Sequence, residues 1–221
     1  MRTLNLGACL CAALLLCGCN PLMTASMDNL KSAVTGPPEL DVSPADVAKV
    51  EFPQLKLTTP SGSGVLAKVR DRGDLQFWVA AGKQVLLMRD GLAVRTIGLG
   101  VDGDLDGTRL ITPSPFKQGL HLLPDGYTSQ RSIDLYKGSE VGVTLNSRFR
   151  RKSTETLRIL NKDYAVLRVD EQIDAPAIGL RATNHYWVDP QDGFILQSEQ
   201  QLTSQLRVKI VQLTADRRPA R

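Results

Sequence analysis

Three acidic residues at alternate positions form the pattern in this sequence that most resembles a metal site. Asp102, Asp104 and Asp106, with a glycine at the sixth position, match the first half of a calcium-binding loop. Three carboxylates this close repel one another, and a bound cation would relieve that repulsion. The twelfth position is Pro113 rather than glutamate, so an ordinary Asp- and Gly-rich loop is the favoured interpretation and calcium the alternative. We therefore expect no metal and no other cofactor.

The remaining residue types that carry chemistry do not assemble into a catalytic motif. The two histidines, His121 and His185, lack a metal-binding spacing and are far apart in the sequence. There is no Gly-x-Ser-x-Gly nucleophile motif, no P-loop and no dinucleotide-binding fingerprint. Because all four cysteines lie at or before position 19, the rest of the chain has neither disulfide nor thiol nucleophile. We therefore expect a protein that is not an enzyme and has no catalytic residues.

Two tryptophans and a basic cluster are the candidates for contact with a polymer or partner. Trp78 and Trp187 each lie in an alternating segment; exposed aromatic rings stack on sugars, although core packing is favoured for at least one. Arg148, Arg150 and Arg151 could contact acidic polymer or lipid headgroups, although a solvated strand face is the favoured interpretation. With 27 Lys and Arg against 23 Asp and Glu, the charge excess is small, and we expect no nucleic-acid partner.

The N-terminal segment indicates export and lipid attachment. Arg2 precedes an uncharged run, residues 4–17, that is shorter than the roughly 20 residues needed to span a bilayer, as in a signal peptide. The Leu-Cys-Gly-Cys sequence at 16–19 resembles the lipobox that lipoprotein signal peptidase reads. Cleavage before Cys19 would leave an acylated first residue, a stable membrane anchor. Because Asn20 stands where Asp would resemble an inner-membrane retention signal, we expect an outer-membrane location with the domain facing the periplasm.

Most of the remaining sequence alternates between apolar and polar residues, the pattern of half-buried strands. Asp90-Gly91 and Asp192-Gly193 are typical of two-residue type I′ hairpins, and Asn161–Asp163 predicts a third tight turn. About ten short strands without a long amphipathic helix predict an all-β protein, an antiparallel β-sandwich or flattened barrel. Strands in the second half are predicted at 132–137, 141–149, 154–160, 164–171 and 205–213.

Four segments are expected along the chain. A short helix should follow the tether, because Ser43 is a good N-cap and Pro44 suits the first helical position. The C-terminal Arg-rich residues are predicted to be a solvated end. The expected boundaries are a lipoprotein signal peptide at 1–18, an acylated N-terminus and tether at 19–44, a single β domain at 45–215 and a basic tail at 216–221.

Two separated blocks of the sequence resemble the YjbF/GfcB family of lipoproteins. The first block runs from Trp78 to Leu99. It is similar to a family pattern of a Trp, then a hairpin whose exposed turn has Gly as its second residue, then Thr-x-Gly-Leu followed by an acidic loop. The second, 184–200, is similar to its Tyr-Trp-x-Asp…Gly…Ser-x-Gln segment. The lipobox, tether, length and strand spacing match as well, so the resemblance covers nearly the whole chain. Extra Asp and Gly residues in the acidic loop, and the stretch 109–130, depart from the pattern.

The resemblance implies a lipoprotein encoded with group 4 capsule or exopolysaccharide secretion genes, and it implies no catalytic residues. We therefore expect an outer-membrane-anchored, non-enzymatic component of capsule or exopolysaccharide assembly or secretion that binds polysaccharide or an outer-membrane secretion protein. The alternative is a tethered periplasmic β-fold carrier or chaperone that holds lipid or acyl chains. An enlarged apolar pocket would favour the carrier, and a shallow aromatic and polar groove would favour polymer.

Overall fold

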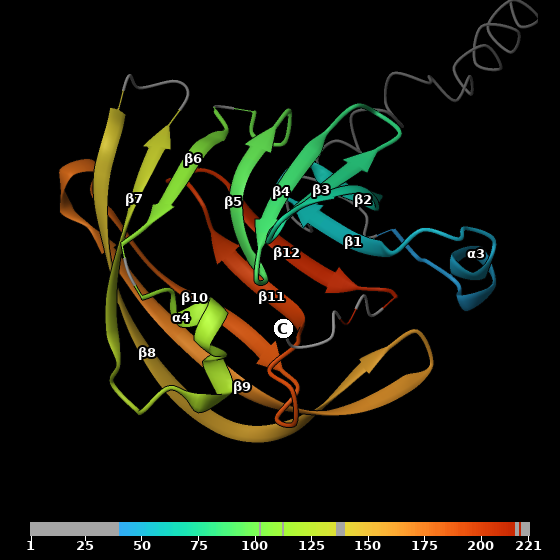
Figure 1. The fold of residues 1–221 in the computed structure, drawn as a ribbon. Coiled ribbons are helices and arrows are strands. Elements are labelled where there is room, and N and C mark those ends of the chain that lie inside the picture. The colour runs from blue at the N-terminus through green and yellow to red at the C-terminus, as the bar shows by residue number, and fades with distance from the viewer. Residues whose placement is uncertain (1–39, 102, 112, 136–139, 215–216, 218–221) are drawn as a thin grey trace, which may run out of the picture. The chain divides into compact units, whose positions relative to one another are not determined.

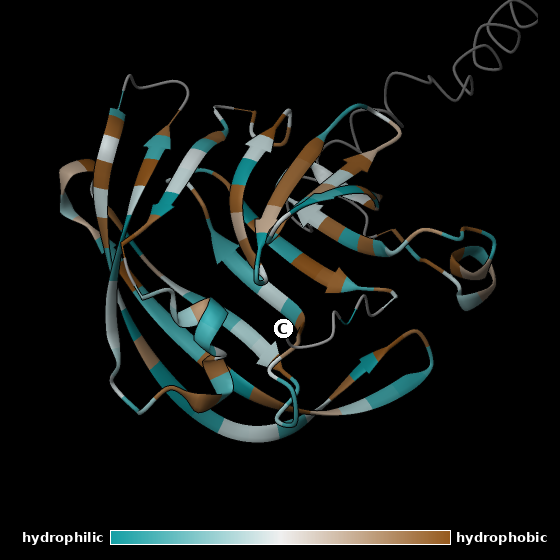
Figure 2. Cartoon of the chain, viewed as in Figure 1, coloured by the Kyte–Doolittle hydropathy of each residue, from teal (hydrophilic) through white to brown (hydrophobic). Residues whose placement is uncertain are grey.

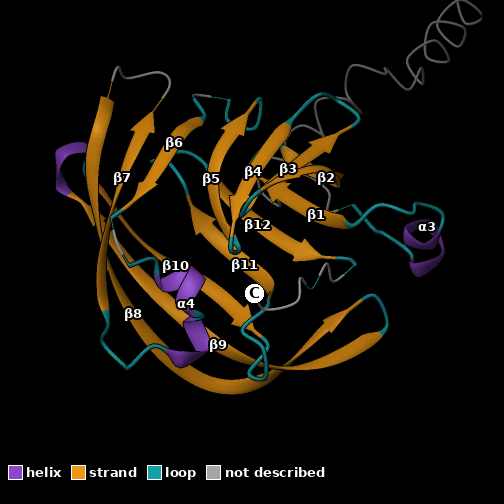
Figure 3. Cartoon of the chain, in the orientation of Figure 1, coloured by secondary structure: helices purple, strands orange, loops and turns teal. Residues whose placement is uncertain are grey.

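A computed structural model of the chain describes residues 40–101, 103–111, 113–135, 140–214 and 217. The predicted signal peptide, Cys19 and most of the tether lie outside these residues. Strands make up most of the described part, and its helices are short (Figure 3). The described helical segments are α3 (Pro44–Ala48), α4 (Pro115–Gln118), η1 (Leu120–Leu122) and η2 (Pro176–Ile178). The strands are β1 (Gln54–Thr59), β2 (Gly62–Arg72), β3 (Leu75–Ala80), β4 (Val85–Arg89), β5 (Leu92–Ile97), β6 (Leu105–Leu110), β7 (Thr128–Leu135), β8 (Glu140–Ile159), β9 (Lys162–Ala175), β10 (Leu180–Val188), β11 (Ile195–Gln201) and β12 (Arg207–Gln212).

Twelve strands in the described residues form one antiparallel sheet in the order β5-β4-β3-β2-β1-β12-β11-β10-β9-β8-β7-β6. Most neighbours in the sheet are also neighbours in sequence, as expected for strands joined by short turns. The exception is the pairing of β1 with β12, which joins the N-terminal and C-terminal parts of the sheet. The predicted all-β, antiparallel fold with a short N-terminal helix is confirmed.

The two end strands of the sheet, β5 and β6, lie side by side (Figure 1). Side-chain contacts join them. The Leu105 amide donates a hydrogen bond to the Thr96 hydroxyl at 2.9 Å, and the Thr96 hydroxyl donates to Asp104 at 2.8 Å. Farther along, Arg95 pairs with Asp106 at 2.8 Å. With its end strands in contact, the sheet is nearly closed into a barrel, and every strand has an inner and an outer face.

Alternation along each strand decides which residues fill the interior (Figure 2). In β10, Asn184, Tyr186 and Val188 are buried, whereas His185 and Trp187 between them are partly exposed on the outer face. Inward-facing apolar residues form two clusters. One contains Trp78 with residues from most strands, and the other contains residues from α4 and β8–β11.

The helix α4 completes the second cluster by inserting an aromatic ring into it. Ser114 caps the helix and Pro115 occupies its first turn, so it begins where these residue types favour a start. Phe116 packs edge-on against Tyr186, with ring centroids 5.4 Å apart, and against Phe149 at 6.0 Å. Burial of one large apolar side chain contributes about 1.5–3 kcal/mol, so these clusters can stabilise a domain that has no disulfide.

A buried polar network separates the two apolar clusters. Glu171, which is fully buried, accepts hydrogen bonds from Ser147 at 2.6 Å, Asn184 at 2.8 Å and Tyr186 at 2.9 Å, and it forms an ion pair with Arg131. Burial raises the pKa of Glu171, but the charge of Arg131 and these hydrogen bonds outweigh burial and hold that pKa below its ordinary value. The same burial, together with the Glu171 charge, raises the pKa of Tyr186 well above its ordinary value.

The local predictions about turns had mixed outcomes. Asp90-Gly91 has positive φ at both residues, as a type I′ turn requires. The prediction for Asp192-Gly193 was wrong, because only Gly193 has positive φ and the connection is a longer loop. In that loop Asp189 and Asp192 accept hydrogen bonds from the backbone N–H groups two residues on, and this favours a different conformation. The third turn centres on Leu160-Asn161 rather than Asn161–Asp163.

Other expected elements are confirmed or differ in extent. The helix α3 starts after Ser43, whose side chain accepts a hydrogen bond from an amide in the first turn. The two strands expected at 141–149 and 154–160 are one strand, β8, with a bulge between Arg151 and Thr154. Part of the predicted solvated tail is bound, because Arg217 pairs with Asp189 and Asp192. Within the described residues, the helices are all too short to cross a membrane.

Candidate functional site

The outer face of β7–β10 carries two parallel rows of polar side chains. Cross-strand pairing sets both rows, because paired residues in an antiparallel sheet point to the same side. The open row consists of Thr128, Arg148, Gln172 and Thr183. The bonded row consists of Gln130, Asn146, Asp174 and Arg181. The residues between the rows, Ser129, Ser147, Ile173 and Ala182, point toward the interior and so present mainly backbone to the outer face.

A hollow of about 900 Å³ lies between these two rows, and residues of both rows line it. We call this hollow the outer groove. It crosses four strands, and Ile111 contributes an apolar side chain beside β7. Most of its lining residues carry an amide, a hydroxyl or a charged group, so it suits a polar ligand better than an acyl chain.

The bonded row is held together by contacts among its own members. Gln130 donates a hydrogen bond to Asn146 at 2.8 Å, Asn146 donates to the Asp174 carbonyl at 3.4 Å, and Arg181 pairs with Asp174 at 3.1 Å. In the described part of the chain, the four side chains of the open row make no hydrogen bond or ion pair with another residue. One wall of the outer groove is therefore organised in advance, and the other has its polar atoms available to a ligand.

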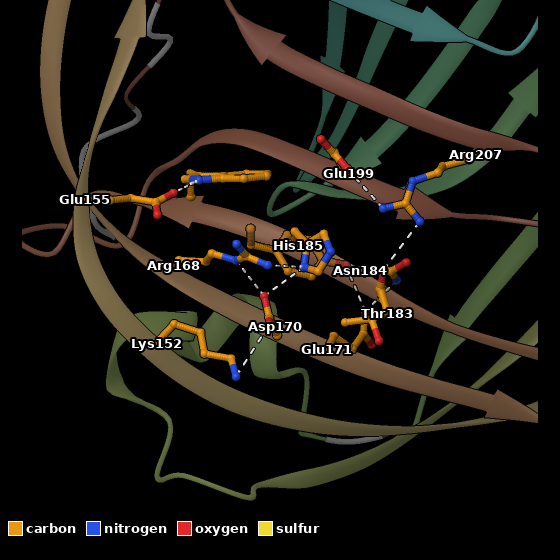
Figure 4. Close-up of polar contacts among 12 residues, drawn as sticks. Lys152, Glu155, Arg168, Asp170, Glu171, Thr183, Asn184, His185, Glu199 and Arg207 are labelled. Atoms are coloured by element: carbon orange, nitrogen blue, oxygen red, sulfur yellow. Dashed lines mark hydrogen bonds and ion pairs between the residues drawn. The ribbon is translucent and has the colours of Figure 1, made fainter. Parts of the chain in front are cut away.

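A charged cluster around Asp170, drawn in Figure 4, lies on the outer face beyond the open row. Asp170 accepts hydrogen bonds from Arg168 at 2.9 Å and His185 at 2.8 Å, and Lys152 lies 3.8 Å away. Burial raises the pKa of Asp170, but the His185 and Arg168 hydrogen bonds outweigh burial and hold that pKa below its ordinary value. The Asp170–His185 pair resembles part of a catalytic triad, although no hydroxyl among the described residues is hydrogen-bonded to His185.

The two tryptophans proposed as contact residues lie in different surroundings, one in the core and one on the outer face. Trp78 is 1% exposed and packs in the first apolar cluster, so it does not reach the surface, and core packing is confirmed for this residue. Trp187 lies on the outer face of β10, where the Arg168 guanidinium is 5.8 Å from its ring centroid and Glu155 accepts its indole N–H. Only Trp187 remains a candidate contact residue.

The three arginines of the basic cluster lie on β8 in different surroundings. Arg148 belongs to the open row, and Arg150 pairs in register with Asp170. Neither guanidinium has an ion-pair partner in the part of the chain that the structure describes. Arg151 lies at the start of the bulge, and its backbone N–H donates to Asp125. All three are exposed, as a solvated strand face requires, but Arg148 also borders the outer groove.

The acidic loop uses its carboxylates for internal contacts. Asp104 accepts hydrogen bonds from the Thr96 hydroxyl and from the backbone N–H groups of residues 98–100, at 2.7–3.1 Å. Asp106 pairs with Arg95, and Asp102 lies outside the described residues. Within the described part of the chain, no group of three His, Cys, Asp or Glu residues is arranged to hold a metal ion. The calcium hypothesis therefore has no support from the placement of Asp104 and Asp106.

Sequence reasoning missed the polar rows and the buried network. Gln172, Asp174 and Thr183 come from strands whose alternation was recognised, but alternation does not reveal which strands pair or in which register. The consecutive polar residues Asp170-Glu171-Gln172 were the available signal, because they break the apolar alternation and place a carboxylate on the inner face.

Comparison with known proteins places the chain in a family. The profile described as group 4 capsule polysaccharide lipoprotein GfcB, YjbF matches residues 27–213. No curated protein matches the sequence. The lipoprotein YmcC of Escherichia coli K12 has a similar structure, with a TM-score of 0.70 at 18% identity over 86% of this chain and 96% of that chain.

Two weaker structural similarities involve an exported protein of Bacteroides fragilis described as having a YmcC-like fold and a lipoprotein of Parabacteroides distasonis. Their TM-scores are 0.32 and 0.34 and their identities 13% and 12%; each comparison covers 74% of this chain, and 95% and 94% of the other chains, respectively. The profile match over most of the chain decides the assignment. The protein belongs to the YjbF family of group 4 capsule polysaccharide lipoproteins.

Proposed function

We propose that this protein is an outer-membrane-anchored, non-enzymatic component of capsule or exopolysaccharide assembly or secretion. In this proposal acylation of Cys19 holds the domain at the periplasmic side of the membrane, and the domain acts by binding polymer. Membership of the capsule polysaccharide lipoprotein family supports the biological setting. The observation that supports the mode of action is the outer groove, whose open row of polar side chains has no hydrogen-bond or ion-pair partner among the described residues.

The interior of the domain gives little support to the alternative of an acyl-chain carrier. A carrier needs an apolar hollow that receives the acyl chain. In the described residues the inward-facing side chains form two packed clusters with the Glu171–Arg131 network between them. Opening such an interior would require separating Glu171 from its hydrogen-bond donors, which is costly in a low-dielectric core. Polymer binding on the outer face requires no such rearrangement.

Deletion and complementation test the proposed function. We expect deletion to reduce surface polysaccharide while polymer continues to be made and accumulates inside the cell. Surface and cell-associated polymer would be quantified separately. Unchanged surface polysaccharide, or loss of polymerisation itself, would contradict the proposal.

A second arm of the experiment tests whether the protein is an enzyme. Asp170→Asn and His185→Gln alter the hydrogen-bonded Asp–His pair on the outer face that resembles catalytic machinery. We expect both variants to restore export almost fully, because a binding module has no single group that performs chemistry. Removing a general acid or base typically costs about 10²–10⁴-fold in rate. If either well-folded variant abolished export at normal abundance, the non-enzymatic interpretation would fail.

A further inference from the structure

We propose that the outer groove binds a stretch of acidic polysaccharide, with Arg148 of the open row contacting its carboxylates. This inference rests on the proposed function, and it adds the ligand class and the residues that contact it.

The shape of the outer groove suits an elongated ligand that lies across the strands. Its two rows are two residues apart along each strand, about 6.6 Å between Cα positions, and the floor between them is backbone. The groove crosses β7, β8, β9 and β10, and four neighbouring strands span about 14 Å from first to last. An extended polymer can therefore lie between the rows with successive units passing successive strands.

The open row provides the hydrogen-bonding groups that a glycan needs. Thr128 and Thr183 supply hydroxyls at its two ends, and Gln172 supplies an amide between them. Hydroxyl and amide groups both donate and accept hydrogen bonds, as sugar hydroxyls do. Because these side chains have no partner in the described part of the chain, a glycan would not have to break existing contacts. The bonded row opposite would act as a fixed wall.

The unpaired charge at the groove is positive. Arg181 is paired with Asp174, the carboxylate of the bonded row, at 3.1 Å. Arg148 in the open row has no counterion among the described residues, and the same is true of Arg150, two residues along the same face of β8. A guanidinium binds a carboxylate through two parallel hydrogen bonds, which neutral sugars cannot offer. The unpaired charge therefore favours an acidic polymer over a neutral one.

The composition of the groove favours a glycan over a protein partner. The cores of protein–protein interfaces are rich in apolar and aromatic residues and poor in charged ones. Here hydroxyl, amide and charged side chains line the walls, with Ile111 as the one exposed large apolar residue among the lining residues that the structure describes. Trp187 lies four residues from Thr183 on the same face of β10, about 13 Å along the strand, and is not one of the residues that line the groove.

The binding experiment uses the full-length acylated protein in detergent micelles and three probes. A polygalacturonate oligomer tests an acidic glycan, a dextran oligomer of similar length tests a neutral glycan, and a poly-glutamate peptide tests an anionic peptide. Calorimetry measures each affinity at low and at moderate salt. We expect the polygalacturonate oligomer to bind most tightly and its affinity to fall as salt increases. Equal binding of dextran, or poly-glutamate binding as tight as that of polygalacturonate, would overturn the proposal.

Variants in the open row connect this binding to the groove. Arg148→Gln should weaken polygalacturonate binding about 10-fold or more, because it removes a charge-assisted hydrogen bond. Gln172→Glu should also weaken polygalacturonate binding, because it places an anion in the groove. It should change the affinity for dextran far less. Arg72→Gln is the matched control, since Arg72 is also an exposed arginine of a strand but lies on β2, away from the outer groove. Each variant is first checked for an unchanged melting temperature. Full binding by Arg148→Gln and Gln172→Glu would overturn the assignment of the groove.

Failure of this inference can be told apart from failure of the proposed function. If polygalacturonate does not bind while deletion still impairs export, the groove assignment is wrong and the proposed function stands. If deletion leaves export unchanged while the wild-type protein binds polygalacturonate through Arg148, the proposed function is wrong and the site stands.

Discussion

Asp170 and Glu171 are consecutive residues of β9, and their carboxylates lie on opposite faces of the same sheet. Asp170 joins Arg168 and His185 on the outer face (Figure 4), whereas Glu171 is fully buried against Arg131. This follows from the two-residue period of a strand, which turns neighbouring side chains to opposite sides. The two carboxylates therefore have different roles. Asp170 holds charged side chains in place on the outer face near the outer groove, and Glu171 joins polar side chains in the core.

The first prediction concerns the buried ion pair. Glu171→Gln should lower the free energy of unfolding by about 3–5 kcal/mol, because it leaves the Arg131 charge buried without a counterion. Arg131→Met should cost less stability in the Glu171→Gln variant than in the wild-type protein, since it removes the charge that Glu171→Gln leaves unpaired. Urea denaturation of the four proteins in this cycle measures the coupling. Additive losses would show that the pair does not act as a unit.

Asp174→Asn is the control, because it alters a half-exposed ion pair on the same strand. It should lower the free energy of unfolding by less than about 1 kcal/mol.

The second prediction concerns the alkaline limit of stability. The folded state raises the pKa of Tyr186 well above the value of about 10 that an unfolded tyrosine has. The stability that depends on neutral Tyr186 is therefore fully present below pH 10 and is lost as the pH rises above that value. Tyr186→Phe should be less stable at neutral pH but should show a shallower loss between about pH 10 and 11. Tyr164→Phe, on the outer face, should keep the wild-type slope, because Tyr186 is still present.

The third prediction separates the structural and metal-binding interpretations of the acidic loop. Asp104→Ala should destabilise the protein by about 2 kcal/mol, because it leaves several donors without an acceptor. Asp106→Ala removes only a half-exposed pair with Arg95 and should cost less than about 1 kcal/mol. Thermal unfolding with and without chelator completes the test. We expect the melting temperature to be insensitive to chelator and reductant; a large drop with chelator would indicate a bound cation.

The fourth prediction concerns the anchor. Cys19→Ser should accumulate as an unprocessed precursor in the inner membrane, because no sulfur remains to accept the diacylglycerol group. Membrane fractionation and the size of the product on a gel measure this. Cys17→Ser, two residues earlier, is the matched control and should be processed normally. Normal processing and outer-membrane fractionation of Cys19→Ser would disprove lipid anchoring at this residue.

Local features of the fold could be read from the sequence because short-range chemistry decides them. Ser43 and Pro44 start α3 as expected, and Asp90-Gly91 makes the type I′ turn. At Asp192-Gly193 the same residue pair did not produce that turn, because nearby aspartates bond to the loop backbone. Turn signals are therefore dependable only where no neighbouring side chain competes for the same backbone groups.

The sequence by itself determined the class of this protein: the predicted lipid anchor, the strand alternation and the two blocks that resemble the family all lie within short stretches of chain. Tertiary structure alone decided which tryptophan is exposed and which residues face one another across β7–β10. Alternation assigns Trp78 and Trp187 to faces, but whether a face becomes interior depends on how the sheet curls. The outer groove depends on the register of four strands, from Thr128 to Thr183, and that register is set by contacts between residues far apart in sequence.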